Sequence, residues 1–450
     1  MELFENLSLN ELMRPEGFDC ECGVHHGVSL KYIKIARGAI RSLPEAVKAV
    51  GGSKPFIVCD KNTYAAAGEK AAAVLKEAGI GSTVFILSEN GYPKCEPNEY
   101  SVGSLCMHFD TTCDTVIGVG GGVINDCCKV FSYSANLPQI IVGTAPSMDG
   151  FASNSSSMVV DSVKTTLYNR CPAGIVLDTE IMAQAPMRML WAGFGDMVAK
   201  YISVCEWRIS HIVTGEYFCE HVAQLMRNAL RKIMAASDKL ALRDPDAVGA
   251  VAEGLVLSGF AMSFAKVSRP ASGLEHYFSH VWEMLALERG KEADLHGIQV
   301  GVGTVLTMNI YDGIKTLVPS REKALRHMAE FDPAAWEKEI RRVFGKTAPQ
   351  VLEIEKKTQK NSPEKHLKRL NAILDNWDAI QKIISEELPD KEWLLGKMRV
   401  TGMPMTPEDI GISHDDVVDA FLRSRDIRDK YLSGSFLWDL GEIEAFAEKL

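Results

Sequence analysis

Short apolar segments alternate with helical patterns over the first third of the chain. An alanine-rich stretch after residue 60 predicts a helix that ends at Gly79. The apolar segments are the lengths of buried strands, and they cover residues 55–60, 82–87, 114–122 and 138–146. Buried strands that alternate with helices are typical of βαβ units, so this part of the chain predicts a parallel sheet.

From about residue 192 the pattern changes to long stretches with apolar residues at helical spacing. These stretches predict helices over residues 196–208, 216–236, 248–267, 276–286 and 297–311. The charged tail from residue 320 also has a helical pattern. The chain is therefore predicted to form an α/β domain with a parallel sheet over residues 1–188 and an all-α domain over residues 189–450. We expect the binding site in the cleft between the two domains.

The composition restricts the class of protein. The chain has 450 residues, of which 46% are hydrophobic and 24% are charged, as in ordinary soluble globular proteins. Its net charge of −10 argues against a nucleic-acid partner, because phosphate backbones attract basic surfaces. No apolar run reaches the roughly 18 residues that span a bilayer, and the acidic N-terminus does not have the pattern of a signal peptide. We therefore expect a cytoplasmic protein without a membrane span.

The cysteines indicate a reducing compartment. There are 11 of them, an odd number in a chain with no predicted signal peptide, which predicts reduced thiols. Cys20, Cys22, His25 and His26 lie close together in the stretch CECGVHHG. However, a C-x-C pair followed at once by two histidines does not have the spacing of a structural zinc site. We interpret the stretch as a local turn or β-hairpin, with metal binding as the less favoured alternative.

A glycine-rich stretch, GVGGGVIND, follows a predicted strand and opens a predicted helix. Glycines there let the backbone approach a diphosphate, and the helix N-terminus supplies N–H groups and a positive dipole. The stretch does not match G-x-G-x-x-G, the Rossmann fingerprint. Asp60, at the end of an earlier strand, is suited to accept the hydroxyls of an adenosine ribose and to repel a 2′-phosphate, which favours NAD over NADP. The alternative is that Asp60 caps the next helix.

A second polar loop follows the next predicted strand. The stretch GTAPSMDGFAS contains Thr144, Ser147, Asp149 and Ser153. It comes at the carboxyl edge of the same predicted sheet, where open α/β sheets bind their ligands. The alternative is a plain turn rich in Asp, Gly and Ser.

One carboxylate and two imidazoles form a candidate metal site. His276 and His280 are four residues apart, so both rings lie on one face of a predicted helix. Glu275 comes before the first histidine rather than after it, so the order is not that of the zincin pattern. Asp196 is expected at the start of a helix, where an N-cap role is the simple alternative. With His276 and His296 it makes a three-ligand set for a divalent ion, although His296 alone is more typical of a core residue.

Several stretches in a fixed order together resemble the sn-glycerol-1-phosphate dehydrogenase family. That family belongs to the superfamily of iron-containing alcohol dehydrogenases, glycerol dehydrogenase and 3-dehydroquinate synthase. The chain looks closest to the bacterial branch, which has a cysteine-rich N-terminal stretch. The resemblance runs from about Asp19 to the C-terminus, over DCECGVHH, GVGGGVINDCCK, TAPSMDGFAS, DTEIMAQAPMRMLWAGFGD, RPASGLEHYFSH, LHGIQVGVGT and IRDKY.

The resemblance implies a fold, an activity and a set of site residues. The fold is that of dehydroquinate synthase, and the activity is the reversible, NAD(P)H-dependent, metal-assisted reduction of dihydroxyacetone phosphate to sn-glycerol 1-phosphate for phospholipid biosynthesis, by a homodimer. A zinc, nickel or iron ion is implied on Asp196, His276 and His296, with Asp149, Asp196 and His280 at the substrate. The positions matched to NAD(H) or NADP(H) are Asp60, Gly120, Gly121, Gly122, Val123, Ile124, Asp126, Thr144, Ser147 and Ser153.

The sequence leaves other functions open. Candidates for the substrate phosphate, which needs cationic or N–H partners, are Arg269, Lys200 and His280. A dehydrogenase for glycerol or another polyol would use the same metal ligands without needing a phosphate. A lyase similar to 3-dehydroquinate synthase would recycle NAD within one turnover. A non-catalytic nucleotide-binding protein would carry the three metal ligands by accident.

Overall fold

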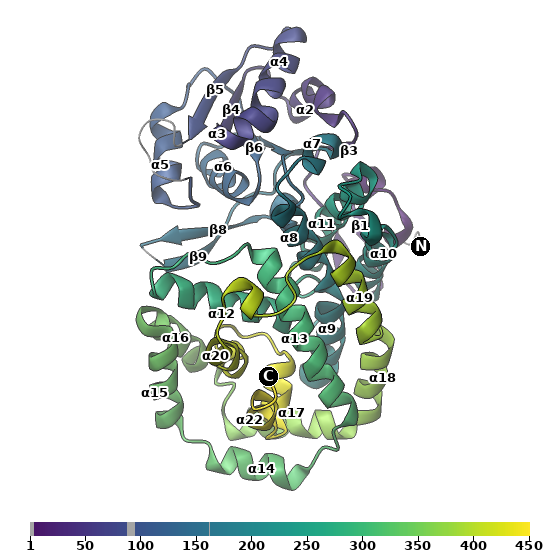
Figure 1. Cartoon of the computed structure of the whole chain (residues 1–450), viewed down its shortest axis with the longest axis vertical. Helices are drawn as coiled ribbons and strands as arrows, with labels where there is room; N and C mark the ends of the chain where they lie inside the picture. Colours follow the sequence, from purple (N-terminus) through teal and green to yellow (C-terminus); the bar gives the residue numbers. More distant parts are fainter. Residues whose placement is uncertain (1–3, 88–94, 162) are drawn as a thin grey trace. The chain divides into compact units, whose positions relative to one another are not determined.

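The computed structural model describes residues 4–87, 95–161 and 163–450 (Figure 1). The chain divides into two compact units: the first contains residues 1–197 and 220–267, and the second contains residues 198–219 and 268–450. The chain therefore passes between the units more than once. This division differs from the single boundary expected between residues 188 and 189, because the helices α10 (Glu220–Ala236) and α11 (Pro245–Ala265) belong to the first unit.

The first unit is built around a parallel sheet, so this part of the predicted fold class is confirmed. The strand order is β3-β10-β7-β6-β4-β5, and every neighbouring pair is parallel. The sequence pattern identified the central strands and the β5 edge, but it did not identify β3 or β10. The strands are β3 (Tyr32–Ala36), β4 (Pro55–Asp60), β5 (Thr83–Leu87), β6 (Thr115–Gly120), β7 (Gln139–Gly143) and β10 (Gly174–Asp178).

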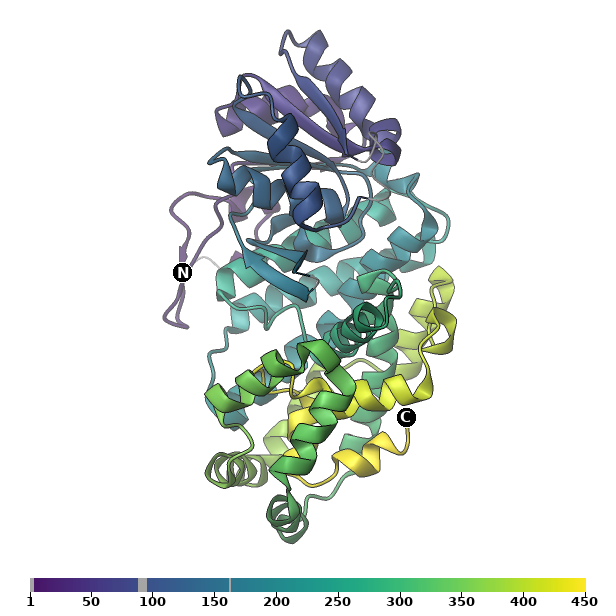
Figure 2. The same ribbon diagram turned by 90° about the vertical axis from the view of Figure 1, so that its left-hand side faces the viewer.

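Helices cover both faces of the sheet (Figure 2). In β4, Phe56 and Val58 pack with α5 (Glu99–His108) and α6 (Gly122–Ser134). The alternate residues Ile57 and Cys59 pack on the other face with α2 (Leu43–Val50) and α4 (Glu69–Glu77). Burial on both faces explains why the strands appear in the sequence as continuous apolar runs rather than as alternating ones.

The strand order reverses between β4 and β6. The chain leaves β4 toward β5 on one side, and it leaves β6 toward β7 on the other. The two strands are paired in register, with Val58 opposite Gly118, so Asp60 and Gly120 end the strands side by side. Ligands of open α/β sheets bind outside the carboxyl ends of the strands at such a reversal, so we expect a ligand to bind next to these two residues.

The remaining elements of the first unit are short, apart from one helix. The hairpin predicted near the N-terminus is confirmed, because Asp19 pairs with His25 in an antiparallel arrangement. These elements are η1 (Phe4–Asn6), α1 (Leu9–Leu12), β1 (Phe18–Asp19), β2 (His25–His26), η2 (Ala39–Ser42), α3 (Lys61–Thr63), η3 (Tyr64–Gly68), η4 (Asp149–Ala152), β8 (Ser155–Val160), β9 (Val163–Tyr168), α7 (Thr179–Ala183), α8 (Met187–Val198) and η5 (Ser237–Lys239).

The helix α11 is a core helix. It is long and apolar enough to cross a membrane by length and composition, but 78% of its most apolar window is buried inside the protein. One hydrogen bond and one packing contact show its place. The hydroxyl of Ser258 donates to the carboxylate of Asp149, and a Cβ added to Gly259 would lie 2.7 Å from the Cβ of Ala152. The apolar pattern of this helix therefore reflects burial in the first unit.

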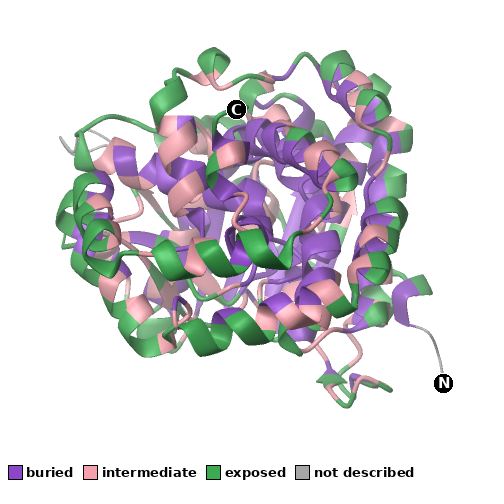
Figure 3. Ribbon diagram, turned by 90° about the horizontal axis from the view of Figure 1, so that it is seen from below, coloured by how far each residue is buried: buried purple, intermediate pink, exposed green. Residues whose placement is uncertain are grey.

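The second unit is helical, as predicted. A Cβ added to Gly303 would lie 2.5 Å from the carbonyl oxygen of Glu275, so a small residue lets α13 approach α12 closely. Figure 3 shows buried residues mainly toward the interior and exposed residues mainly along the outside. The elements are α9 (Lys200–Thr214), α12 (Leu274–Glu288), α13 (His296–Thr316), α14 (Arg321–Glu330), α15 (Pro333–Phe344), η6 (Gly345–Thr347), α16 (Ala348–Thr358), α17 (Pro363–Asp375), α18 (Trp377–Glu387), α19 (Lys391–Thr401), η7 (Glu408–Ile410), α20 (His414–Ser424), α21 (Ser433–Asp439) and α22 (Ile443–Ala447).

Close packing of α8 on the loop after β7 gives a test of the first unit. A Cβ added to Gly193 would lie 1.7 Å from the carbonyl oxygen of Pro146. We expect Gly193→Ala to lower the free energy of unfolding by about 1–3 kcal/mol, because a rigid backbone atom must move. In the control Gly103→Ala, in α5, the new Cβ meets nothing within 4 Å, so we expect about 0.5–1 kcal/mol of stabilisation. Urea unfolding measures both, and equal effects would contradict the packing.

Candidate functional site

The glycine turn after β6 lies against the polar loop after β7. The amide of Thr144 donates to the carbonyl oxygen of Gly120 over 3.2 Å. Gly121 is the residue before α6, and a Cβ on it would lie 3.6 Å from the Oγ of Ser147. The structure therefore brings the two loops that the resemblance matched to NAD(P) together, at the carboxyl ends of adjacent strands.

The first turn of α6 contains the other positions matched to the nucleotide. Gly122 begins the helix, and Val123 is half-buried. Ile124 is buried, and its Cγ1 lies 2.6 Å from where a Cβ on Gly120 would be. The glycine at position 120 is therefore required by the packing of this helix on the strand, and Ile124 offers a ligand only its backbone.

A buried lysine, which the sequence did not identify, holds these loops. Lys129 pairs with the carboxylate of Asp126 over 2.9 Å and donates to the Oγ of Ser153 and the carbonyl oxygen of Gly150, both over 3.3 Å. The carboxylate of Asp126 also accepts from the amide of Ser157 over 3.1 Å. A buried charge needs such partners. Asp126 and Ser153, both matched to NAD(P), therefore have structural bonds of their own.

Asp60 caps the helix that follows it, which was the alternative to a role in ribose binding. Its carboxylate accepts from the amide of Thr63 over 2.8 Å, and the hydroxyl of Thr63 accepts from the amide of Asp60 over 2.9 Å. This capping box fixes the carboxylate at the end of β4, beside the reversal of strand order. Contact of Asp60 with a ribose stays a prediction.

In the first unit, the backbone of Asp149 contacts the carboxylate of Asp196 at the end of α8. The amide of Asp149 donates to Oδ2 of Asp196 over 3.0 Å, and the hydroxyl of Ser258 donates to Oδ2 of Asp149 over 2.8 Å. Asp196 is fully buried. The expected helix start at Asp196 is wrong: α8 begins at Met187, so the residue lies in the last turn and is not an N-cap.

In the second unit, three histidine rings gather between α12 and α13. The ring centroids of His276 and His296 are 5.4 Å apart, those of His280 and His296 are 5.5 Å apart, and those of His276 and His280 are 6.3 Å apart. The spacing of four residues places His276 and His280 on one face of α12, as predicted, and His296 begins α13.

Carboxylates orient these rings. The Nδ1 of His276 lies 2.8 Å from Oε1 of Glu275, and the Nδ1 of His296 lies 3.2 Å from Oε1 of Glu283 and 3.0 Å from the Oγ of Ser279. A ring that donates from Nδ1 to a carboxylate presents an unprotonated Nε2, which is the usual arrangement of metal-binding histidines. The side chains of His276 and His296 therefore fit the metal that the resemblance implies.

Glu283 is a polar residue that the sequence did not single out. Ligand atoms of His280, Glu283 and His296 all lie within 4.8 Å of one another, and the Nδ1 of His280 lies 3.6 Å from Oε2 of Glu283. Burial lowers the pKa of His280 well below its usual value, although the hydrogen bond to Glu283 opposes this. One carboxylate thus contacts a candidate metal ligand and a candidate substrate residue.

The two cations considered for the substrate phosphate are bound inside the second unit. The ammonium of Lys200 donates to the carbonyl oxygen of Ala271 over 3.0 Å and is buried. Arg269 donates to the carbonyl oxygen of Tyr431 over 2.8 Å and pairs with Glu216 over 2.6 Å. Both side chains therefore have structural partners, and neither one is supported by the described contacts as a phosphate ligand.

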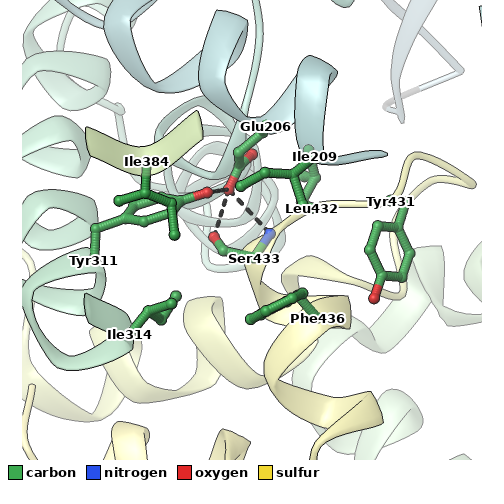
Figure 4. Close-up of a pocket in the computed structure, with 9 residues that line it drawn as sticks. All are labelled: Glu206, Ile209, Tyr311, Ile314, Ile384, Tyr431, Leu432, Ser433 and Phe436. Atoms are coloured by element: carbon green, nitrogen blue, oxygen red, sulfur yellow. Dashed lines mark hydrogen bonds between the residues drawn. The ribbon is translucent and has the colours of Figure 1, made fainter. Parts of the chain in front are cut away.

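A small cavity in the second unit surrounds the buried carboxylate of Glu206 (Figure 4). Its volume is about 10 Å³, which matches one water molecule rather than a substrate. Glu206 accepts from the amides of Leu274 and Ser433, each over 2.9 Å, and from the hydroxyl of Tyr311 over 3.3 Å. The carboxylate therefore joins α9, α12, α13 and the start of α21 from inside.

Comparisons of the sequence with known proteins identify relatives. The family model described as iron-containing alcohol dehydrogenase matches residues 34–186. The chain is 37% identical over 294 residues to the glycerol-1-phosphate dehydrogenase [NAD(P)+] of Halalkalibacterium halodurans. The aligned region covers 65% of this chain and 74% of that protein. The chain is 34% identical over 347 residues to the enzyme of the same name from Bacillus licheniformis, covering 75% of this chain and 85% of that protein.

Solved structures share the fold. A glycerol dehydrogenase from Schizosaccharomyces pombe has a TM-score of 0.58 at 17% identity and covers 93% of this chain and 90% of its own. An archaeal alcohol dehydrogenase from a Red Sea brine pool has a TM-score of 0.58 at 14% identity, covering 95% of this chain and 98% of its own. These likenesses confirm the predicted fold, which the chain shares with both dehydrogenases.

The buried Glu206 predicts a dependence of stability on pH. Burial, with Glu275 nearby, raises its pKa from 4.5 to about 7. Its folded-state pKa is above the unfolded value, so its contribution to stability is complete below pH 4.5 and is lost as the pH rises through about 7. We expect Glu206→Gln, which cannot ionise, to gain stability relative to the unaltered protein over this range. Urea midpoints at pH 5 and pH 8 test this, and a constant difference would contradict the burial of a titrating carboxyl.

Proposed function

The chain belongs to the glycerol-1-phosphate dehydrogenase family, and from this premise we propose that it reduces dihydroxyacetone phosphate to sn-glycerol 1-phosphate with NAD(P)H. The observation that carries the proposal is the identity to enzymes of that name over most of their length. The strand reversal and the histidine cluster support the proposal, because they are suited to a nucleotide and a metal, the two groups that this chemistry uses. We further propose a cytoplasmic homodimer.

The nucleotide is proposed to bind at the reversal between β4 and β6. Amides at the start of α6 face the diphosphate, where the helix dipole favours negative charge. Asp60 accepts the ribose hydroxyls, and its carboxylate disfavours the additional phosphate of NADP, so NAD is the preferred cofactor. The close packing of Gly120 on Ile124 and the bonds of Lys129 hold both loops in place.

The metal is proposed to bind Asp196, His276 and His296. When bound, a divalent ion there polarises the carbonyl oxygen of the substrate as a Lewis acid. Zinc, nickel and iron all accept carboxylate and imidazole ligands, so the donors do not choose among them. Glu275 and Glu283 keep Nε2 of the two rings available by holding Nδ1.

The proton that the reduced oxygen needs is proposed to pass through His280. Its Nδ1 faces Glu283, which leaves Nε2 to face the substrate. Asp149, held by Ser258, binds a substrate hydroxyl. Because Glu283 contacts both His280 and His296, it fixes the proton relay and one metal ligand together.

A group of cations in the second unit is suited to the substrate phosphate. Burial, together with Arg269 and Arg428, lowers the pKa of Lys430 to about 7. Arg428 also helps to lower the pKa of His280, after burial. Arg428 is exposed, unlike Arg269, whose charge Glu216 already pairs. We therefore assign phosphate recognition to Arg428, in the stretch IRDKY.

The substrate assignment is tested by NADH oxidation. We expect turnover with dihydroxyacetone phosphate, loss after a chelator, and recovery when zinc, nickel or iron is added back. Dihydroxyacetone and glycerol should be poor substrates, because they lack the phosphate. Equal kcat/KM for the phosphorylated and unphosphorylated compounds would instead support a polyol dehydrogenase.

The metal ligands are tested by Asp196→Asn. The amide keeps an acceptor for the N–H of Asp149, so the fold should be retained while the charge is lost. We expect kcat/KM to fall more than about a hundredfold, with loss of bound metal. The exposed Asp375→Asn on α17 is the matched control and should keep both. Full metal content and turnover in Asp196→Asn would refute the ligand set.

The phosphate assignment is tested by Arg428→Ala. Loss of a charge-assisted hydrogen bond should lower kcat/KM for dihydroxyacetone phosphate roughly tenfold to a hundredfold, mainly through KM. The slow reaction with dihydroxyacetone should be unchanged, because that compound has no phosphate. Arg326→Ala, exposed on α14, is the control. An equal fall in kcat/KM for both substrates would show that Arg428 does not bind the phosphate.

A further inference from the structure

Sulfur and nitrogen donors converge at the N-terminal hairpin, outside the candidate active site. Gly23 has a φ of +81° and donates to the carbonyl oxygen of Cys20 over 3.0 Å, so the chain reverses tightly between β1 and β2. The ligand atoms of Cys20, Cys22 and His26 lie within 4.8 Å of one another. The Sγ of Cys22 lies 3.3 Å from Nε2 of His26.

The ring of His26 is oriented for coordination. Its Nδ1 lies 2.8 Å from the carbonyl oxygen of Phe264 at the end of α11, so Nδ1 carries the proton and Nε2 presents its lone pair toward the sulfurs. This backbone bond is the support that metal-binding histidines usually have. The ring is fully buried and stacks on Phe264. Burial also lowers its pKa, which favours the neutral ring.

A further thiol is carried to this place by α10. The first turn of α10 lies on the N-terminal segment, because His221 pairs with Glu5 over 3.1 Å and with Glu21 over 3.4 Å. Cys219 is joined by its peptide bond to Glu220, the first residue of α10, and its sulfur falls in the same 4.8 Å group of ligand atoms. The group of ligand atoms therefore contains three sulfurs and one nitrogen.

From this geometry we propose that Cys20, Cys22, His26 and Cys219 form a structural zinc site. Three thiolates and one imidazole are a common ligand set for structural zinc, and a tetrahedral ion with bonds of about 2.3 Å holds its sulfurs about 3.8 Å apart. The four ligand atoms all lie within 4.8 Å of one another, so no pair exceeds that spacing by more than about 1 Å. Protein atoms supply all four donors, so no position is open to a substrate, and the ion would be structural rather than catalytic.

The proposed ion would fasten the N-terminal hairpin to the start of α10. The hairpin strands have only two residues each, too few to be stable by themselves. Aromatic contacts of Phe4 with Phe18, His26 and Phe264 cover the site from the apolar side. Cys20 and Cys22 are only partly buried, which gives an ion a path from solvent. The proposal is independent of the enzymatic function proposed above.

Metal analysis of the full chain tests the site. The protein is purified with reductant and without chelator, and its metal is measured by mass spectrometry. We expect Cys22→Ser and Cys219→Ser each to lose about one zinc per chain relative to the unaltered protein. The control Cys106→Ser, at an exposed thiol on α5, should lose none. Asp196→Asn should lose only the metal proposed at Asp196, His276 and His296. The two metal sites can therefore be refuted independently.

Two measurements on the unaltered protein guard against variants that do not fold. Cobalt substitution should produce the near-ultraviolet absorption of thiolate-bound cobalt, and a chelator should abolish it. The same chelator should make Cys20, Cys22 and Cys219 reactive to alkylation, as mapped by peptide mass spectrometry. Unchanged zinc content in both variants, cobalt without thiolate absorption, or a disulfide between Cys20 and Cys22 in the reduced preparation would each overturn the proposal.

Discussion

Asp196 and His276, two buried side chains of the candidate metal site, each bind another polar group. In the first unit the carboxylate of Asp196 accepts the amide of Asp149. In the second unit Glu275 holds His276, and Glu283 holds His296. A buried polar group without a partner costs about 1–3 kcal/mol, so these bonds are a condition of the fold as well as of the site. The residues that orient the candidate ligands are therefore also residues that the core needs.

Much of the fold could be predicted from the sequence, because strands that are buried on both faces of the sheet appear as continuous apolar runs. The strands β4, β6 and β7 have such runs, and the edge strand β5 is apolar although it is partly exposed. The predicted limits of all four strands are close to the observed ones. The pattern did not reveal β3, since YIKIA mixes charged and apolar residues, nor β10, although GIVLD is as long and as buried as the strand QIIVG of β7. The helix boundary at Asp196 was also missed, because α8 and α9 are separated by a single residue and their apolar patterns run together.

The site was predictable where its residues are close in sequence or match a family motif. The pairing of His276 with His280 on one face follows from helical spacing alone. By contrast, Lys129 and Glu283 look like ordinary charged residues of a helix, and only the structure shows that Lys129 also binds the loop after β7 and that Glu283 also contacts His296 at the start of α13. The same limit applies to CECGVHHG, whose spacing argued against a metal. Its fourth donor, Cys219, is far along the chain, and a spacing rule for adjacent residues has no way to include it.

The passage of the chain between the two units has a consequence for its synthesis. The segment 198–219 belongs to the second unit, yet the ribosome makes it before α10 and α11 of the first, and the rest of the second unit, residues 268–450, follows last. At about 5–20 residues per second, α9 waits on the order of tens of seconds for its partners. Its apolar side chains, Trp207 among them, are buried in the finished protein. The nascent chain therefore presents an uncovered apolar helix to chaperones throughout that interval.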